Sequence, residues 1–126
     1  MSPARLRAAA LLCLLALAAA LGSCGHSDPR EVPGGDDSSG NHLLQTYGCG
    51  SCHAIPGVSG ANGRVGPPLN DFAERQYIAG KYPNTAENLI AWIMHPQQLD
   101  PGVAMPEMNV TDQDATDMAA YLYTLN

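Results

Sequence analysis

Residues 49–53 read Cys49-Gly50-Ser51-Cys52-His53. Two thiols three positions apart occupy neighbouring points of one helical turn, and the imidazole of the next residue follows them round. This C-x-x-C-H pattern is typical of c-type haem attachment, in which the two thiols bind the vinyl groups of one haem. We therefore predict that Cys49 and Cys52 carry one covalent haem c and that His53 is an iron ligand.

Two other kinds of site use closely spaced cysteines. A thioredoxin-like redox pair lies in a strand–helix unit, whereas here a helical pattern precedes the motif and a loop rich in glycine and proline follows it. A structural zinc site takes four nitrogen or sulfur ligands, usually with a second cysteine pair, and the sequence has no second C-x-x-C. Haem attachment is therefore the interpretation that fits the pattern best.

The N-terminal region is typical of an exported protein. Residues 1–7 contain two arginines, and residues 8–21 are apolar apart from Cys13. This run is shorter than the roughly 17–25 residues that span a bilayer, so it favours a signal peptide. Residues 21–24, Leu-Gly-Ser-Cys, resemble a bacterial lipoprotein signal. We predict a signal peptide of the lipoprotein type at residues 1–23 and acylation of Cys24; the alternative is an ordinary cleaved signal with a chance cysteine.

The next segment has the composition of a linker. Glycine, serine, proline and aspartate dominate it, and Val32 is its single aliphatic residue. Such a composition cannot bury enough apolar surface to fold alone. We predict that residues 24–39 form the acylated cysteine and a flexible linker, and that residues 40–126 form the folded domain.

Cysteine count and charge narrow the function classes. Once residues 1–24 are set aside, Cys49 and Cys52 are the remaining cysteines, so no disulfide framework is expected. Without the signal peptide, four basic residues stand against twelve acidic ones, a formal charge of −8. Nucleic-acid binding needs clustered lysine and arginine and is therefore disfavoured. Anionic head groups would repel the chain, so membrane attachment would have to come from the lipid anchor.

The rest of the chain predicts an all-α fold with long loops and no strand, because apolar residues recur at helical spacing. Three to four short helices cannot bury a large core, so we expect the loops to wrap round the haem, which supplies the apolar centre. The expected elements are a short helix at 42–47, a loop at 54–68, a brief helix at 71–77, a helix that Asn84 caps and Pro96 ends, a loop at 97–110, and a last helix that begins after the N-cap Thr111.

The second axial ligand decides what the haem can do. Met94 and Met118 lie in apolar helical stripes, where methionine more often packs than ligates. Met105 stands in Asp100-Pro101-Gly102-Val103-Ala104-Met105-Pro106, where proline and glycine fix an extended loop. We predict Met105 as the ligand, and Met108 in the same loop is the alternative. The histidines are less suited: His26 in the linker, His42 before the motif, and His95, expected to be solvated.

These motifs together resemble the monohaem class I c-type cytochromes, and they are most similar to the cytochrome c domain fused to subunit II of haem–copper cytochrome oxidases. The resemblance covers residues 40–126 and implies the class I cytochrome c fold. It is carried by Cys49–His53, Gly66-Pro67-Pro68-Leu69, the 84–96 helix with Pro83-Asn84-Thr85 and His95-Pro96-Gln97, Pro101–Met105, and Ala120-Tyr121-Leu122.

The same resemblance implies roles for residues round the haem. The Pro67 carbonyl is expected to accept a hydrogen bond from the His53 Nδ1–H and so to fix the imidazole. Leu69 and Trp92 are expected to pack on the haem. The candidates for propionate contacts are Arg75, Asn84 and Tyr82, and their alternative is to be surface side chains.

A His/Met pair raises the potential of haem c relative to two histidines, and it fills both axial positions, which leaves one-electron transfer. The acids are scattered and no catalytic dyad is visible. We therefore expect an electron carrier rather than an enzyme, lipid-anchored on the periplasmic or extracytoplasmic side of a bacterial membrane, between an upstream reductase and a terminal oxidase. Two alternatives stay open: an open-site haem enzyme or gas sensor if Met105 is not a stable ligand, and an electron-entry subunit of a larger dehydrogenase or oxidase complex.

Overall fold

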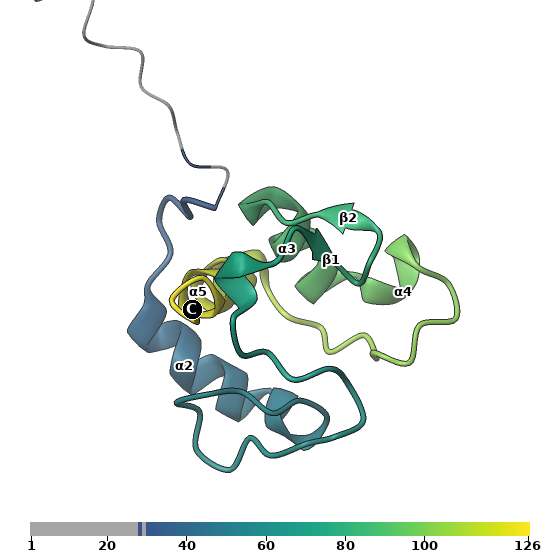
Figure 1. Ribbon diagram of the computed structural model, residues 1–126, viewed down its shortest axis with the longest axis horizontal. Coiled ribbons are helices and arrows are strands. Elements are labelled where there is room, and N and C mark those ends of the chain that lie inside the picture. Colours follow the sequence, from purple (N-terminus) through teal and green to yellow (C-terminus); the bar gives the residue numbers. More distant parts are fainter. Residues whose placement is uncertain (1–27, 29) are drawn as a thin grey trace, which may run out of the picture.

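Two crossing helices, α2 (Asp37–Thr46) and α5 (Asp112–Leu122), form the centre of the fold in this computed structural model, which describes residue 28 and residues 30–126 (Figure 1). The helices approach closely at Gly40, where an added Cβ would lie 2.0 Å from the Asp117 carbonyl oxygen. Only glycine fits there, because real Cβ atoms do not come so near to backbone. The predicted signal peptide at residues 1–23 and the predicted lipid anchor Cys24 lie outside the described residues.

Helix α5 begins where the sequence predicts. The Thr111 hydroxyl oxygen accepts from the Asp114 amide at 3.2 Å, and Asp112 and Asp114 lie in the first turn, where the helix dipole favours acids. Met118 is fully buried, as the apolar stripe predicts. Helix α5 is therefore both the best-predicted and the most deeply buried helix of the domain.

Helix α2 begins earlier than predicted, inside the segment assigned to a linker. The Asp36 side chain accepts from the Ser39 amide at 2.7 Å and so caps the helix. The Asp-Asp-Ser-Ser run at residues 36–39 that reads as linker is thus the start of a helix. The predicted start of the folded domain at residue 40 is therefore too late, because helix α2 begins at Asp37.

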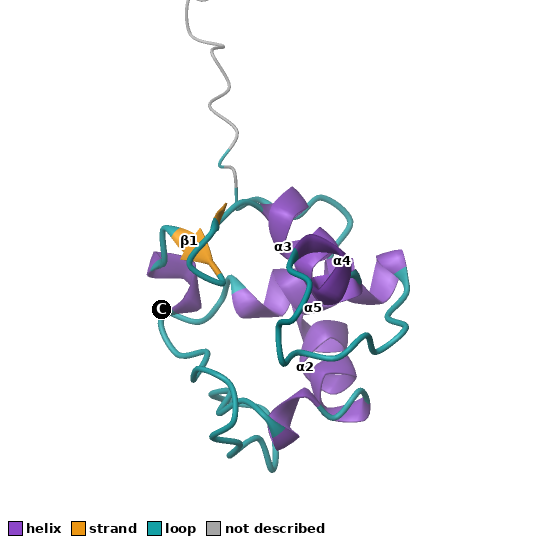
Figure 2. Cartoon of the chain, turned by 90° about the vertical axis from the view of Figure 1, so that its right-hand side faces the viewer, coloured by secondary structure: helices purple, strands orange, loops and turns teal. Residues whose placement is uncertain are grey.

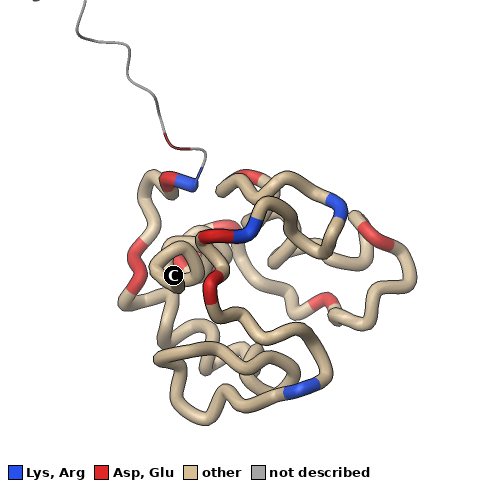
Figure 3. Tube along the Cα trace, in the orientation of Figure 1, with Lys and Arg blue, Asp and Glu red and all other residues tan. Residues whose placement is uncertain are grey.

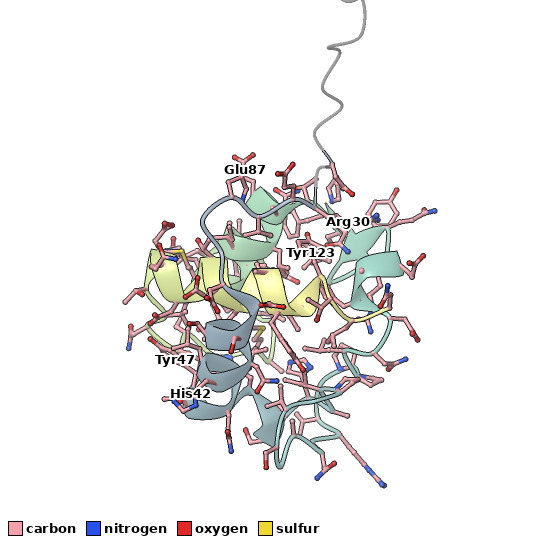
Figure 4. The ribbon with its side chains drawn as sticks, turned by 90° about the vertical axis from the view of Figure 1, so that its left-hand side faces the viewer. Arg30, His42, Tyr47, Glu87 and Tyr123 are labelled. Carbon is pink, nitrogen blue, oxygen red and sulfur yellow. The ribbon has the colours of Figure 1, made fainter. Side chains whose placement is uncertain are left out.

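The chain before α2 is also attached to the domain. One Arg30 guanidinium nitrogen donates to the Arg75 carbonyl at 3.1 Å, and the Asp36 amide donates to the Asp117 carboxylate at 3.0 Å. Figure 4 shows Arg30 beside Tyr123, at the C-terminal end of α5. The prediction of a flexible linker therefore fails for residues 30–39, because Arg30, Gly34 and Asp36 are hydrogen-bonded to the folded domain.

Helix α3 (Ala86–Met94) lies against α5 and is followed at once by the short helix α4 (Pro96–Leu99) (Figure 1). Thr85 caps α3, since its hydroxyl oxygen accepts from the Asn88 amide at 3.3 Å. The prediction that Asn84 is the cap is wrong by one residue, because the Asn84 side chain is buried elsewhere. Pro96 ends α3 as predicted, and it also begins α4 at the first position, where proline needs no amide hydrogen.

A small hairpin replaces the helix predicted at residues 71–77. The structure has the 3-10 turn η2 (Phe72–Glu74) and then the antiparallel strands β1 (Tyr77–Ile78) and β2 (Tyr82–Pro83). Ile78 pairs with Tyr82 across a turn in which Ala79 and Gly80 have positive φ. The expectation of no strand is thus wrong for four residues, although the all-α fold class holds (Figure 2).

The apolar core lies between α2, α3 and α5. Long loops make up much of the remaining chain, as Figure 2 shows. Half-buried apolar side chains pack on this core, among them Cys49, Leu69 and Met105. Within residues 28 and 30–126, no helix has the length and apolar character that crossing a bilayer requires.

Candidate metal centre

The cysteine motif forms a tight turn directly after α2. Gly48 has φ of 73°, which reverses the chain, and the 3-10 turn η1 (Cys49–Ser51) follows. The His53 amide donates to the Cys49 carbonyl at 3.0 Å, so the motif continues as one helical turn. Cys49 and Cys52 are free and half-buried. Burial raises the pKa of the Cys49 thiol, and the neighbouring Cys52 adds to that rise.

The glycine-rich loop at residues 54–68 wraps back onto this turn. The Gly63 amide donates to the Gly50 carbonyl at 3.0 Å, and the Gly66 amide donates to the Cys52 carbonyl at 2.9 Å. A Cβ on Gly63 would lie 2.3 Å from the backbone of Cys52. The loop can approach the motif so closely because these contacts are made by residues without side chains.

His53 is fixed in one orientation. Its Nδ1 lies 2.7 Å from the Pro67 carbonyl oxygen. Since a carbonyl can only accept, Nδ1 carries a proton. In the neutral ring Nε2 then keeps its lone pair, which is the form of imidazole that ligates metals. This is the hydrogen bond that the resemblance implies.

The backbone of Gly66 lies directly against the His53 ring. An added Cβ there would lie 2.4 Å from His53 Cε1, 2.7 Å from Nδ1 and 2.9 Å from Nε2. Gly66 lies in the Gly-Pro-x-Leu stretch, but that motif does not by itself predict the steric role of the glycine. The signal that points to it is a glycine one residue before a proline that is expected to contact the histidine.

The two candidate methionines differ in their surroundings. Met105 is half-buried and packs against the apolar core, whereas Met108 is 38% exposed. Met118 lies fully inside the core and Met94 packs against it, as expected of structural methionines. Among the histidines, His42 and His95 are exposed and His26 lies outside the described residues. Met105 therefore packs against the same core as Cys49, whereas Met108 of the same loop is exposed.

Leu69 and Trp92 belong to the same apolar cluster but differ in burial. Trp92 is buried on α3, and its ring packs against Tyr82 with centroids 6.0 Å apart. Leu69 is half-buried, and its amide donates to the Ala54 carbonyl at 2.8 Å, directly after the cysteine motif. Both residues thus belong to the core that the motif packs on.

The three candidates for propionate contacts all have partners in the protein. Asn84 is buried and donates to the carbonyls of Phe72 and Arg75, both at 3.0 Å, so both of its amide hydrogens are used. Its oxygen accepts from Tyr123, whose pKa burial raises to about 12. Asn84 therefore has a structural role, and the alternative of a surface side chain is wrong for it.

Arg75 and Tyr82 also hold backbone. Arg75 donates to the Asn70 carbonyl at 2.9 Å and to the Pro68 carbonyl, so it fixes the end of the loop that carries Pro67. Tyr82 donates to the Leu99 carbonyl at 2.7 Å and so fixes α4. Each of them positions a segment next to the site.

Comparison with known proteins identifies the family. The family model for cytochrome c matches residues 38–126 of the chain. The chain belongs to the cytochrome c family. A cytochrome c oxidase subunit 2 of Alkalihalophilus pseudofirmus is 37% identical over 89 residues, which are 70% of this chain and 25% of that protein. A cytochrome c oxidase subunit 2 of Bacillus subtilis is 34% identical over 86 residues, 67% of this chain and 24% of that protein. The chain thus spans about a quarter of the length of these relatives.

The described residues of this cytochrome c fit the covalent haem c that the family implies. Two free thiols and a histidine with a free Nε2 lone pair lie on one turn. Gly66 leaves room for the imidazole where any other side chain would displace it. Cys49, Leu69 and Met105 are half-buried apolar groups on one core, and a flat apolar cofactor can cover such surfaces.

Proposed function

We propose that this cytochrome c is a one-electron carrier in which His53 and Met105 fill both axial positions of a haem held by Cys49 and Cys52. When bound, haem c supplies a one-electron couple whose potential a methionine ligand raises. The observation that carries the proposal is the His53 Nδ1 contact with the Pro67 carbonyl, which leaves Nε2 as the free ligating atom.

Each residue has a separate task in this proposal. The thiols keep the cofactor attached in an exported protein. The Pro67 carbonyl and Gly66 orient the imidazole, and a hydrogen-bonded ring is a stronger ligand. Met105 is preferred to Met108 because it is the less exposed of the two and packs against the core. With both axial positions filled, the site offers no place for oxygen or peroxide, and the protein acts as an electron transfer protein and not as an enzyme.

The closed site has a direct test. Carbon monoxide added to the reduced protein at neutral pH should leave the visible spectrum unchanged, because Met105 occupies the position that the gas would take. Immediate formation of a carbon monoxide complex would contradict the proposal and favour an open-site enzyme or gas sensor.

We also propose that the protein is tethered to the extracytoplasmic side of a bacterial membrane through an acylated Cys24. Support comes from the lipoprotein-like Leu21-Gly22-Ser23-Cys24 sequence. Arg30 is hydrogen-bonded to the domain and follows Cys24 by six residues. Six residues span at most about 20 Å. Such a tether would keep the domain near the membrane surface and raise its effective concentration at membrane-bound partners.

The proposed partners are an upstream reductase and a terminal oxidase. The relatives named cytochrome c oxidase subunit 2 support an oxidase as acceptor. They also favour a second candidate function, a haem subunit held permanently in a larger oxidase or dehydrogenase complex. Stable co-purification with a catalytic subunit after detergent extraction would distinguish this from a carrier.

Removing the anchor tests the tether. The Cys24→Ala variant should appear as a released haem protein that is still reducible but supports oxidase turnover of membranes poorly at equal total concentration. Unchanged turnover, or a wild-type protein that is already free of membranes, would show that the tether has no role.

A further inference from the structure

The loop that carries Met105 has few attachments. Figure 1 shows it as the long segment that runs from α4 to α5. Within it the Val103 amide donates to the Asp100 carbonyl at 3.0 Å. In the part of the chain that the structure describes, a single hydrogen bond joins residues 101–110 to chain outside residues 100–110. Its acceptor is the side chain of Glu107.

Glu107 joins this loop to the start of α4. One carboxylate oxygen accepts from the Gln97 amide at 3.1 Å, and the other lies 3.6 Å from His95 Nδ1. The first amides of a helix have no acceptor within the helix, and the N-cap residue His95 makes no capping hydrogen bond through its side chain. Glu107 therefore caps α4 from ten residues further along the chain.

Helix α4 is a fixed support for this contact. At its C-terminal end the Tyr82 hydroxyl donates to the Leu99 carbonyl at 2.7 Å, and the Lys81 ammonium pairs with Asp100 at 2.7 Å. Between α4 and Val110 lies a hollow of about 430 Å³. Glu107 and Gln97 both line this hollow and are joined by the hydrogen bond described above.

We propose that Glu107 is a positioning residue that holds Met105 in place for iron ligation, an inference that rests on the proposed function of Met105. Pro106 alone separates the two residues and fixes its own φ. The anchored carboxylate therefore limits how far the backbone of Met105 can move. Without it, residues 101–110 keep, among the described residues, the Val103 hydrogen bond to Asp100 and the packing of their buried and half-buried side chains.

The test measures how fast imidazole replaces the methionine in the oxidised holoprotein, followed by loss of the sulfur-to-iron charge-transfer band. Glu107→Ala should react about tenfold faster, the effect of losing one hydrogen bond to a charged group. Glu107→Gln keeps an oxygen acceptor for the Gln97 amide and should lie between this variant and the wild type. Glu87→Ala removes an exposed acid from the first turn of α3 and should keep the wild-type rate (Figure 4).

Several results would overturn the proposal. A wild-type rate in Glu107→Ala would do so, as would an equal acceleration in Glu87→Ala, which would reduce the effect to net charge. A lower midpoint of unfolding with an unchanged imidazole rate would make Glu107 merely structural. Absence of the charge-transfer band in the wild type would refute the Met105 ligation itself, whereas an intact wild-type band with an unaffected Glu107→Ala would refute the Glu107 role alone.

Discussion

The two loops that carry the proposed axial ligands are built in different ways. The loop after the cysteine motif, residues 54–68, is tied to the motif by the Gly63, Val65 and Gly66 amides. Residues 101–110 carry Met105. Among the described residues, their hydrogen bond to chain outside residues 100–110 is the one that the Glu107 side chain accepts from the Gln97 amide. The two loops also differ in charge. The charged residue of the first loop is Arg64, whereas the second contains Glu107 and lies between Asp100 and Asp112. Figure 3 shows how the basic and acidic positions are distributed along the chain.

This difference indicates which ligand the fold itself positions and which one would depend on its bond to iron. Backbone atoms of residues 66 and 67 position the His53 ring. Met105 has no such hydrogen-bonded cage among the described residues, so its position is expected to depend on the bond to iron. The histidine side should therefore be the rigid side of the site, and the methionine side the exchangeable one.

Removing both thiols of the histidine-side motif should change the protein most, because the covalent attachment of the haem is lost. The double variant Cys49→Ala plus Cys52→Ala should yield polypeptide without haem that resists extraction by acid acetone, because no thiol remains to bind the vinyl groups. Its apo-chain should also be largely unfolded, since the haem provides much of the apolar centre. Haem that stays covalently attached would contradict the account, and a cooperative thermal transition without haem would contradict the second part.

A smaller effect is expected from crowding the histidine. Gly66→Ala places a methyl group 2.4 Å from the His53 ring, so the ring or the loop must shift. The expected loss is about 1–3 kcal/mol of unfolding free energy, typical of overpacking. The potential should rise, because a ring that loses its Nδ1 hydrogen bond is a weaker donor to the oxidised iron. Denaturant unfolding followed by visible absorption measures the first, and redox titration the second. Ser59→Ala, an exposed change in the same loop, serves as the control. If Gly66→Ala were as stable as that control, the described rigidity of this loop would be wrong.

The elements that the sequence predicts well have local signals. Helix α5 has a threonine cap, acids in its first turn and an apolar stripe, and all three are present as expected. The cysteine motif likewise needs only five consecutive residues. Resemblance to a known family adds the His53–Pro67 contact, which joins residues 14 positions apart and follows from no local pattern.

The missed features depend on contacts between distant residues. The strands β1 and β2 have two residues each, too few for an alternating pattern to be visible. The start of α2 has the composition of a linker, and its attachment comes from Asp117, 81 residues later. Asn84 reads as a cap, but the carbonyls of Phe72 and Arg75 bind its side chain inside the domain.

Ligation of the iron by Met105 opposite His53 can be tested with the sulfur-to-iron charge-transfer band of the oxidised protein in two matched variants. Met105→Ala should abolish the band and lower the potential, because the thioether ligand is lost. Met108→Ala removes an equal side chain from the same loop and should leave the band intact. A band that survives in Met105→Ala and disappears in Met108→Ala would contradict the account and assign the ligand to Met108.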